Sequence, residues 1–247
     1  MYRIVSSFFL FIFSVHAMPI GNPASPAILQ EGFFVPDTAW SQPRLGYTED
    51  FVHSCNLKSQ TAQVKNGWLK SRSELVAITW SILERLNLSV ILGTGKNTFH
   101  FQFQSNPIHG QVSGGLSWAA EGKLILLEVK DTTLSLFGLG GGYNWMTGKI
   151  TIDHQIHPQT CSSMKFWQAG ASLTQKLGIF FPYIGIVFFQ AKWSLSPQNE
   201  TTFYFEEKHS LGPFLGCSLS SGSQFLLNLE WRVWIENGGS ISAEIRF

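Results

Sequence analysis

The residues best placed to do chemistry are charged side chains that alternate with apolar ones near the end of the sequence. Glu230 and Arg232 are two residues apart, and so are Glu244 and Arg246, with one apolar residue between the members of each pair. Because successive residues of a β-strand point to opposite faces of a sheet, each charged pair shares one face. Two interpretations fit this pattern. The charges line a water-filled path and set its selectivity, or they pair with one another in a filled interior.

Polar side chains also occupy one face of other alternating stretches. In residues 99–104, three phenylalanines alternate with His100, Gln102 and Gln104, and Asn87 lies between two leucines. The pattern predicts that the apolar residues face lipid and the polar residues face the interior. The residues expected to line the interior are Asn87, His100, Gln102, Gln104, Glu230, Arg232, Glu244 and Arg246. Those expected to face lipid include Phe99, Phe101, Phe103, Leu227, Leu229, Trp231 and Val233.

No group of residues forms a recognisable catalytic motif. The histidines are spread along the chain, and none lies in a motif that joins it to a serine nucleophile and a carboxylate. Glu206 and Glu207 are adjacent, so a strand would point them to opposite faces. The run Gly138–Gly142 lacks the helix and the Lys-Ser/Thr pair of a phosphate-binding loop. We therefore expect no enzyme, no cofactor and no metal site.

The three cysteines, Cys55, Cys161 and Cys217, leave at least one thiol unpaired within the chain. Their spacing lacks the Cys-x-x-Cys pairs of a zinc site. In an oxidising compartment, three outcomes stay open: a disulfide between Cys55 and Cys161, a disulfide to another protein, and free thiols.

The beginning of the chain predicts an export signal. Arg3 supplies a positive charge, and an apolar stretch of about 12 residues follows, which is shorter than the roughly 20 residues of a spanning helix. Val15-His16-Ala17 fits the small-x-small rule, so we expect cleavage after Ala17. The expected segments are a signal peptide at residues 1–17, an irregular, proline-rich periplasmic lead-in at 18–43 and a barrel at 44–247.

The rest of the chain shows a period of two and no helical periodicity of useful length. Only 13% of the residues in the whole sequence are charged and 14% are aromatic, which suits a wall with lipid on its outer side. A soluble β-sandwich is the alternative, although its outer faces would normally carry more charge. Residues 240–247 alternate and end on Phe247, as the closing strand of an outer-membrane barrel does. The sequence thus predicts an all-β fold, a transmembrane antiparallel β-barrel.

Turn signals set the expected strand number. Short turns are expected at the periplasmic rim, whereas longer segments at 54–73, 144–163 and 195–201 are expected outside. The short turns are Glu84-Arg85, Asn106 to His109, Lys130-Asp131, Leu177-Gly178 and Ser221-Gly222. The count closes at about 12 strands, within a range of about 10 to 16.

Several short segments resemble the chlamydial major outer membrane protein family. They are Pro19-Ile-Gly-Asn-Pro-Ala, Leu45-Gly-Tyr with Asp50-Phe-Val, the stretch from Leu83 to Gly93, Trp167-Gln-Ala with Phe181-Pro-Tyr-Ile-Gly-Ile, and Ser242-Ala-Glu-Ile-Arg-Phe. They follow the same order as in that family and cover both ends of the chain well and the middle poorly. The resemblance implies a surface-exposed, oligomeric porin with disulfide cross-links in the envelope. The chain departs from the family in being shorter, with smaller surface loops, and in having few cysteines.

We therefore expect a passive channel for small hydrophilic solutes and ions in the bacterial outer membrane, in contact with its lipid. The resemblance adds two expected partners, a second copy of the chain and other envelope proteins joined by disulfides. Nucleic acid is not an expected partner, because 17 basic residues against 16 acidic ones give no basic face. The alternative is a non-conducting structural or adhesin-type surface barrel.

Overall fold

The computed structural model describes residues 20–28, 41–61, 64–82, 85–103, 106–152, 155–197, 202–220 and 224–247, which form the all-β fold that the sequence predicts. The helix α2 (Ser25–Ile28) is a single turn. No helix among these residues is long and apolar enough to cross a membrane. The predicted signal peptide with its cleavage site after Ala17, Glu84, Gln104 and Ser221-Gly222 lie outside the described residues.

Within the described residues, twelve antiparallel strands belong to one sheet. Period-2 sequences rich in aromatic and β-branched residues favour this extended form. The strands are β1 (Ser41–Ser59), β2 (Val64–Ile82), β3 (Leu86–Phe103), β4 (Asn106–Ser113), β5 (Ser117–Val129), β6 (Thr132–Ile152), β7 (Gln155–Gln175), β8 (Phe180–Ser196), β9 (Phe203–Glu207), β10 (Leu211–Leu219), β11 (Phe225–Arg232) and β12 (Glu236–Arg246).

The sheet closes into a ring of ten strands at one end. The number is ten and not twelve because β4 and β5 lie end to end in one position of the ring, and β9 and β10 lie end to end in another. β4 and β5 run in the same direction along β3, which pairs with β4 through residues 96–103 and with β5 through 86–93. The break between them falls at Gly114 and Gly115, whose φ values of 73° and 85° suit glycine. β9 and β10 follow one another along β8 in the same way.

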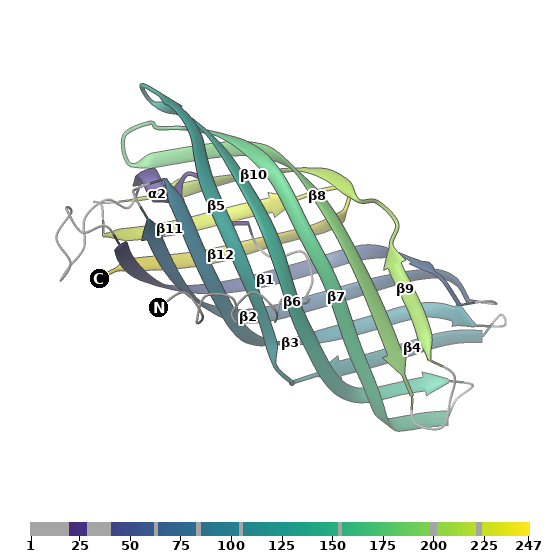
Figure 1. The fold of residues 1–247 in the computed structure, drawn as a ribbon. Coiled ribbons are helices and arrows are strands. Elements are labelled where there is room, and N and C mark those ends of the chain that lie inside the picture. The colour runs from purple at the N-terminus through teal and green to yellow at the C-terminus, as the bar shows by residue number, and fades with distance from the viewer. Residues whose placement is uncertain are drawn as a thin grey trace, which may run out of the picture.

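The ring narrows to eight strands toward its other end. The hairpin of β11 and β12 is short, and beyond its tip β9 pairs directly with β1, where Leu57 lies opposite Glu207. The wide end carries α2 and the C-terminus, and the narrow end carries β4 and β9 (Figure 1). The expected strand number is therefore confirmed, although the ring itself holds ten strands rather than twelve.

The described short turns lie together at the wide rim. Lys130-Asp131 joins β5 to β6, and Leu177-Gly178 lies between β7 and β8. The strands that flank 83–84 and 221–223 end at this rim as well. The expected periplasmic turn at Asn106 to His109 is wrong, because these residues begin β4 at the opposite rim.

Exposed apolar side chains form a belt around the wide half of the barrel. β2 contributes Val76, Ile78 and Trp80, and β11 contributes Leu229 and Trp231. A strand needs about 9–11 residues to cross a bilayer, whereas β1 and β2 each have 19 and β6 and β7 each have 21. The belt therefore marks the part of each long strand that lies in lipid, and the remainder extends beyond it.

Beyond the belt, the outer face of the barrel becomes polar. Along β2 the outward residues after Val76 are Glu74, Arg72 and Lys70, and Lys96 is exposed beside them on β3. The outer face of the narrow half is therefore like that of a water-soluble β-barrel.

The interior of the narrow half is an apolar core. Phe101 packs edge-to-face against Phe203 and Phe205, with ring centroids 5.1 and 5.0 Å apart. Trp193 and Phe99 are also buried there, at 2% and 0% exposure. Each such side chain contributes about 1.5–3 kcal/mol when it leaves water. Interior and exterior thus exchange polarity between the two halves of one continuous wall.

Candidate functional site: the barrel interior

Polar side chains line the interior of the wide half, because strand periodicity points alternate residues inward. They are buried, while many of the residues between them are exposed and apolar. The buried set includes Thr79, Ser81, Asn87, Ser89, Ser135, Ser172, Thr174, Ser218, Asn228, Ser240 and Ser242. This amphipathic wall is the one that a membrane-spanning barrel requires.

One arginine holds three carboxylates beside the end of the belt. Arg232 donates from Nε to Glu236 at 2.6 Å, from Nη1 to Glu230 at 2.8 Å and from Nη2 to Asp50 at 2.5 Å. All four side chains are at most 4% exposed. The hydroxyl of Tyr183 donates to the second oxygen of Glu230 at 3.3 Å. Every nitrogen of the guanidinium therefore has an acceptor, which is what a buried arginine needs.

The segment 20–28 lies inside the wide end of the barrel, and we call it the plug. The backbone N–H of Ile20 donates to Glu230 at 3.1 Å, which joins the plug to the arginine cluster. Asn22 donates to Ser218 at 3.0 Å. Both Ile20 and Asn22 are fully buried, so the plug lies among the strands rather than across their ends.

The helix α2 at the end of the plug is tied to the wall. Arg44 donates to the carbonyl oxygen of Ser25 at 3.1 Å, and Asn87 donates to the hydroxyl of Ser25, also at 3.1 Å. The same arginine lies 3.9 Å from Glu244. These bonds hold a one-turn helix that would be unstable alone.

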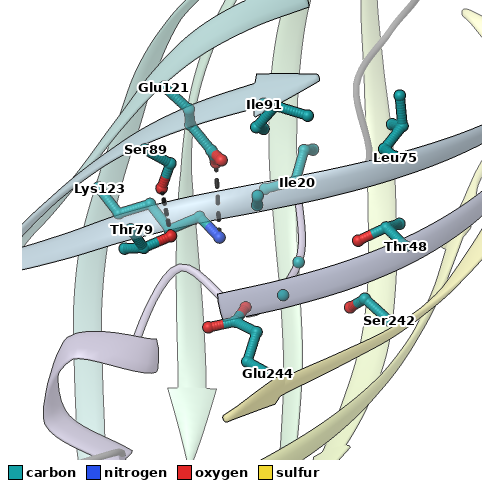
Figure 2. Close-up of a pocket in the computed structure, with 13 residues that line it drawn as sticks. Ile20, Thr48, Leu75, Thr79, Ser89, Ile91, Glu121, Lys123, Ser242 and Glu244 are labelled. Atoms are coloured by element: carbon teal, nitrogen blue, oxygen red, sulfur yellow. Dashed lines mark hydrogen bonds and ion pairs between the residues drawn. The ribbon is translucent and has the colours of Figure 1, made fainter. Parts of the chain in front are cut away.

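A small cavity remains between the plug and the wall. Its volume is about 30 Å³, which has room for about two water molecules. Figure 2 shows Ile20 of the plug at this cavity, with Glu121 paired to Lys123 at 3.5 Å and Thr79 bonded to Ser89 at 2.8 Å.

The structure places several of the predicted interior residues on the inner face. Asn87, Glu230, Arg232 and Arg246 are at most 5% exposed, and Glu244 lines the small cavity. They do not form one group: Glu230 and Arg232 meet in the arginine cluster, whereas Glu244 lies near Arg44. Whether any of them lines a solute path stays a prediction.

The predicted facing of residues 99–103 is wrong. Phe99 and Phe101 are buried in the apolar core at 0% and 3% exposure, whereas His100 and Gln102 lie on the outer face. The reason is that β3 is one uninterrupted strand, so the inward face set by Asn87 runs on through every second residue. Leu229 and Trp231 do face outward, as predicted.

His100 lies on the outer wall of the narrow half instead of in a lumen. Its ring stacks on Trp68 at 3.8 Å, and its Nδ1 contacts Nδ1 of His109 on β4. Partial burial, with smaller effects of His109 and Lys70, lowers the pKa of His100. Among the described residues, no group of three or more His, Cys, Asp and Glu side chains is arranged to hold a metal ion.

All three cysteines are free thiols. Cys55 is buried in the interior and Cys161 is exposed on the outer face of β7, so the wall of the barrel separates them. The predicted disulfide between Cys55 and Cys161 is therefore wrong for this fold. Cys217 faces outward at intermediate exposure.

The sequence interpretation missed Asp50, Glu236 and the plug. Asp50 could have been found from local alternation. Tyr47 and Phe51 lie on the outer face of β1, so Asp50, at an even-numbered position between them, must lie on the inner face. Glu236 could not have been found in this way, because its bond to Arg232 forms only when the short turn between β11 and β12 brings the two side chains together. The plug is recognisable only from contacts far apart in the sequence.

No protein-family model and no curated protein matches the sequence. Solved bacterial outer-membrane barrels have a similar fold. The translocator domain of the autotransporter NalP from Neisseria meningitidis is 13% identical, with a TM-score of 0.43 over 85% of this chain and 90% of that one. The outer membrane protease OmpT from Escherichia coli is 12% identical, with a TM-score of 0.40 over 84% and 96%. The beta domain of the Bordetella autotransporter BrkA is 10% identical, with a TM-score of 0.42 over 85% and 99%.

Proposed function

We propose that the protein is a closed β-barrel of the bacterial outer membrane that does not conduct solutes in this conformation. The observation that supports this proposal is an interior filled at two levels. The apolar core around Phe101 fills the narrow half, and the plug fills the wide end. The proposed role is structural or adhesive, and the outer face of the narrow half performs it at the cell surface.

The proposed orientation places the wide rim in the periplasm. The long polar extensions of the strands beyond the belt lie at the other rim, and bacterial outer-membrane barrels carry their longer extensions on the extracellular side. An export signal cleaved after Ala17 would leave the plug close to the new N-terminus, on the periplasmic side. The proposal includes no catalytic turnover.

A liposome swelling assay tests the proposal. Folded protein in liposomes is mixed with sugars and amino acids of graded size, and we expect no faster swelling than in protein-free liposomes. Heat-modifiable gel mobility of the protein recovered from the liposomes confirms that it is folded and inserted. Size-dependent swelling with the wild-type protein would overturn the closed barrel.

A porin for small hydrophilic solutes and ions is the second candidate. The observation that favours it is the polar interior of the wide half, where Ser81, Ser135 and Ser172 have hydroxyls without a hydrogen-bond partner among the described residues. Buried hydroxyls of this kind are satisfied by water. Conduction would require both the plug and the apolar core to move.

Ion selectivity tests the porin candidate. A conducting barrel with Arg232→Gln and Arg246→Gln would lose two interior cations and keep the carboxylates of Glu230 and Glu244, so its reversal potential under a salt gradient should shift toward cation preference. An unchanged reversal potential would remove these residues from the conduction path. The homo-oligomer and the disulfides to other envelope proteins stay predictions from the family resemblance.

A further inference from the structure

A row of five residues crosses the outer wall where the belt ends. Trp231 pairs with Gly239, Gly239 with Phe51, Phe51 with Arg72, and Arg72 with Lys96, across β11, β12, β1, β2 and β3. Trp231, Phe51, Arg72 and Lys96 are exposed on the outer face. The row therefore places two aromatic rings beside two cations at the edge of the lipid.

Gly239 leaves a depression between the two aromatic rings, because it is the member of the row without a side chain. Two outer grooves meet at this depression and share Phe51, Trp231 and Gly239. The upper groove, of about 410 Å³, is lined by His53, Lys70, Arg72 and Lys96 beyond the belt. The lower groove, of about 420 Å³, lies within the belt and is lined by Leu215, Leu229 and Ile241.

The charges of the upper groove favour an anion. Lys96 has no ion-pair partner among the described residues, and Lys70 lies 5.1 Å from the ring of Trp68. Arg72 is bonded to Glu49 at 2.5 Å and is still 64% exposed, so it keeps donors available. Each cation near a membrane surface strengthens the binding of an anionic lipid about fivefold.

The apolar lining of the lower groove indicates which class of anion can occupy both grooves. It opens into the hydrocarbon region and is lined by apolar side chains, so a water-soluble ion or a polar protein loop would leave it unfilled. An acyl chain fills it without losing hydration. We propose that these joined grooves bind a phosphate-bearing lipid of the surrounding leaflet, with its head group among Lys70, Arg72 and Lys96 and one acyl chain beside Trp231.

Native mass spectrometry of the protein in detergent micelles tests this site with dioleoyl phosphatidic acid as the probe. We expect retention of this lipid and at least tenfold weaker retention of dioleoyl phosphatidylcholine, whose head group has no net charge. Phosphatidic acid with six-carbon chains should also bind more weakly, because it does not fill the lower groove. Equal retention of the two dioleoyl lipids would overturn the proposal.

The double variant Lys70→Gln/Lys96→Gln should weaken phosphatidic acid binding about tenfold to thirtyfold, from two surface cations. The matched control Lys58→Gln/Lys208→Gln removes the same charge from exposed positions of the narrow half outside the grooves. We expect less than a twofold effect from it, and equal losses in the two variants would overturn the assignment. Heat-modifiable gel mobility confirms that each variant is folded, and Lys96→Gln alone serves if the double variant is not.

Inorganic phosphate distinguishes a lipid site from an ion site. At a hundredfold molar excess over phosphatidic acid, we expect it to displace little of the bound lipid. Complete displacement would show that the upper groove binds the phosphate ion alone, and the lipid assignment would then be wrong. Both outcomes are independent of whether the barrel conducts.

Discussion

Arg232 is surrounded by three buried carboxylates. Its loss would therefore leave three buried negative charges without their cation, whereas loss of a cation on the outer face leaves a carboxylate in contact with water. Arg232→Met keeps most of the side-chain volume and removes the charge. We expect the free energy of unfolding to fall by about 3–5 kcal/mol, as for other buried charge partners. Urea unfolding in lipid vesicles, followed by tryptophan fluorescence, measures the change.

The control for this prediction is Lys192→Met. Lys192 lies 3.6 Å from Glu206 on the outer face and is 64% exposed, so its loss should cost about 1 kcal/mol or less. Similar losses in Arg232→Met and Lys192→Met would mean that the arginine cluster is not the buried network described here.

His100 makes the stability of the narrow half depend on pH. Burial, His109 and Lys70 hold its pKa below the ordinary value of 6.5, so the unfolded chain binds more protons as the pH falls through that value. The folded state therefore loses stability on acidification, by a small amount because the ring is partly exposed. In His109→Gln, an NMR titration should show the pKa of His100 moving up toward 6.5. A pKa that stays in place would exclude the contact with His109 as a cause.

At the scale of elements, strand β3 carries the clearest prediction. Because the strand is continuous, Phe101 must lie in the core and not in lipid. Phe101→Ala should lower the free energy of unfolding by about 3–5 kcal/mol, as for other buried aromatic side chains. Gln102→Ala on the outer face should change it by about 0.5 kcal/mol or less. Equal stabilities of the two variants would restore the lipid-facing assignment of Phe101.

Local alternation was sufficient to predict strands, the wide-rim turns at Lys130-Asp131 and Leu177-Gly178, and the inward position of Glu230 and Arg232. It was insufficient at β3, because the sequence 99–104 has the same polar and apolar period whether its surroundings are lipid or a protein core. In the wide half the outer face is apolar, and in the narrow half the inner face is apolar. The half in which a residue lies depends on how long its strand is, which the local pattern does not show. The prediction took the faces from this local pattern alone and therefore assigned residues 99–103 to the wrong faces.

The plug and the narrowing of the ring were beyond any local pattern. Ile20 contacts Glu230, and β9 pairs with β1 beyond the tip of the β11–β12 hairpin. Both depend on contacts between residues more than a hundred positions apart. Gly114 and Gly115 were visible in the sequence, but a pair of glycines marks a turn as readily as a break within one strand.

At the scale of the whole molecule, the wall has two zones with opposite polarity, and this sets which thiol is accessible. Cys161 is exposed on the narrow half, whereas burial raises the pKa of the Cys55 thiol and keeps it unreactive. A membrane-impermeant maleimide added to intact bacterial cells should label Cys161 and spare Cys55, as peptide mass spectrometry would show. Labelling of Cys161 only after the outer membrane is permeabilised would reverse the proposed orientation.

Single-channel recording in planar bilayers tests the closed barrel most directly. Purified protein, with its folding confirmed by heat-modifiable gel mobility, is inserted into a bilayer under voltage and symmetric salt. Because the apolar core and the plug fill the interior in series, we expect no unitary currents above those of the protein-free membrane. Stable, ohmic single-channel steps from the wild-type protein would contradict the closed interior and favour the porin.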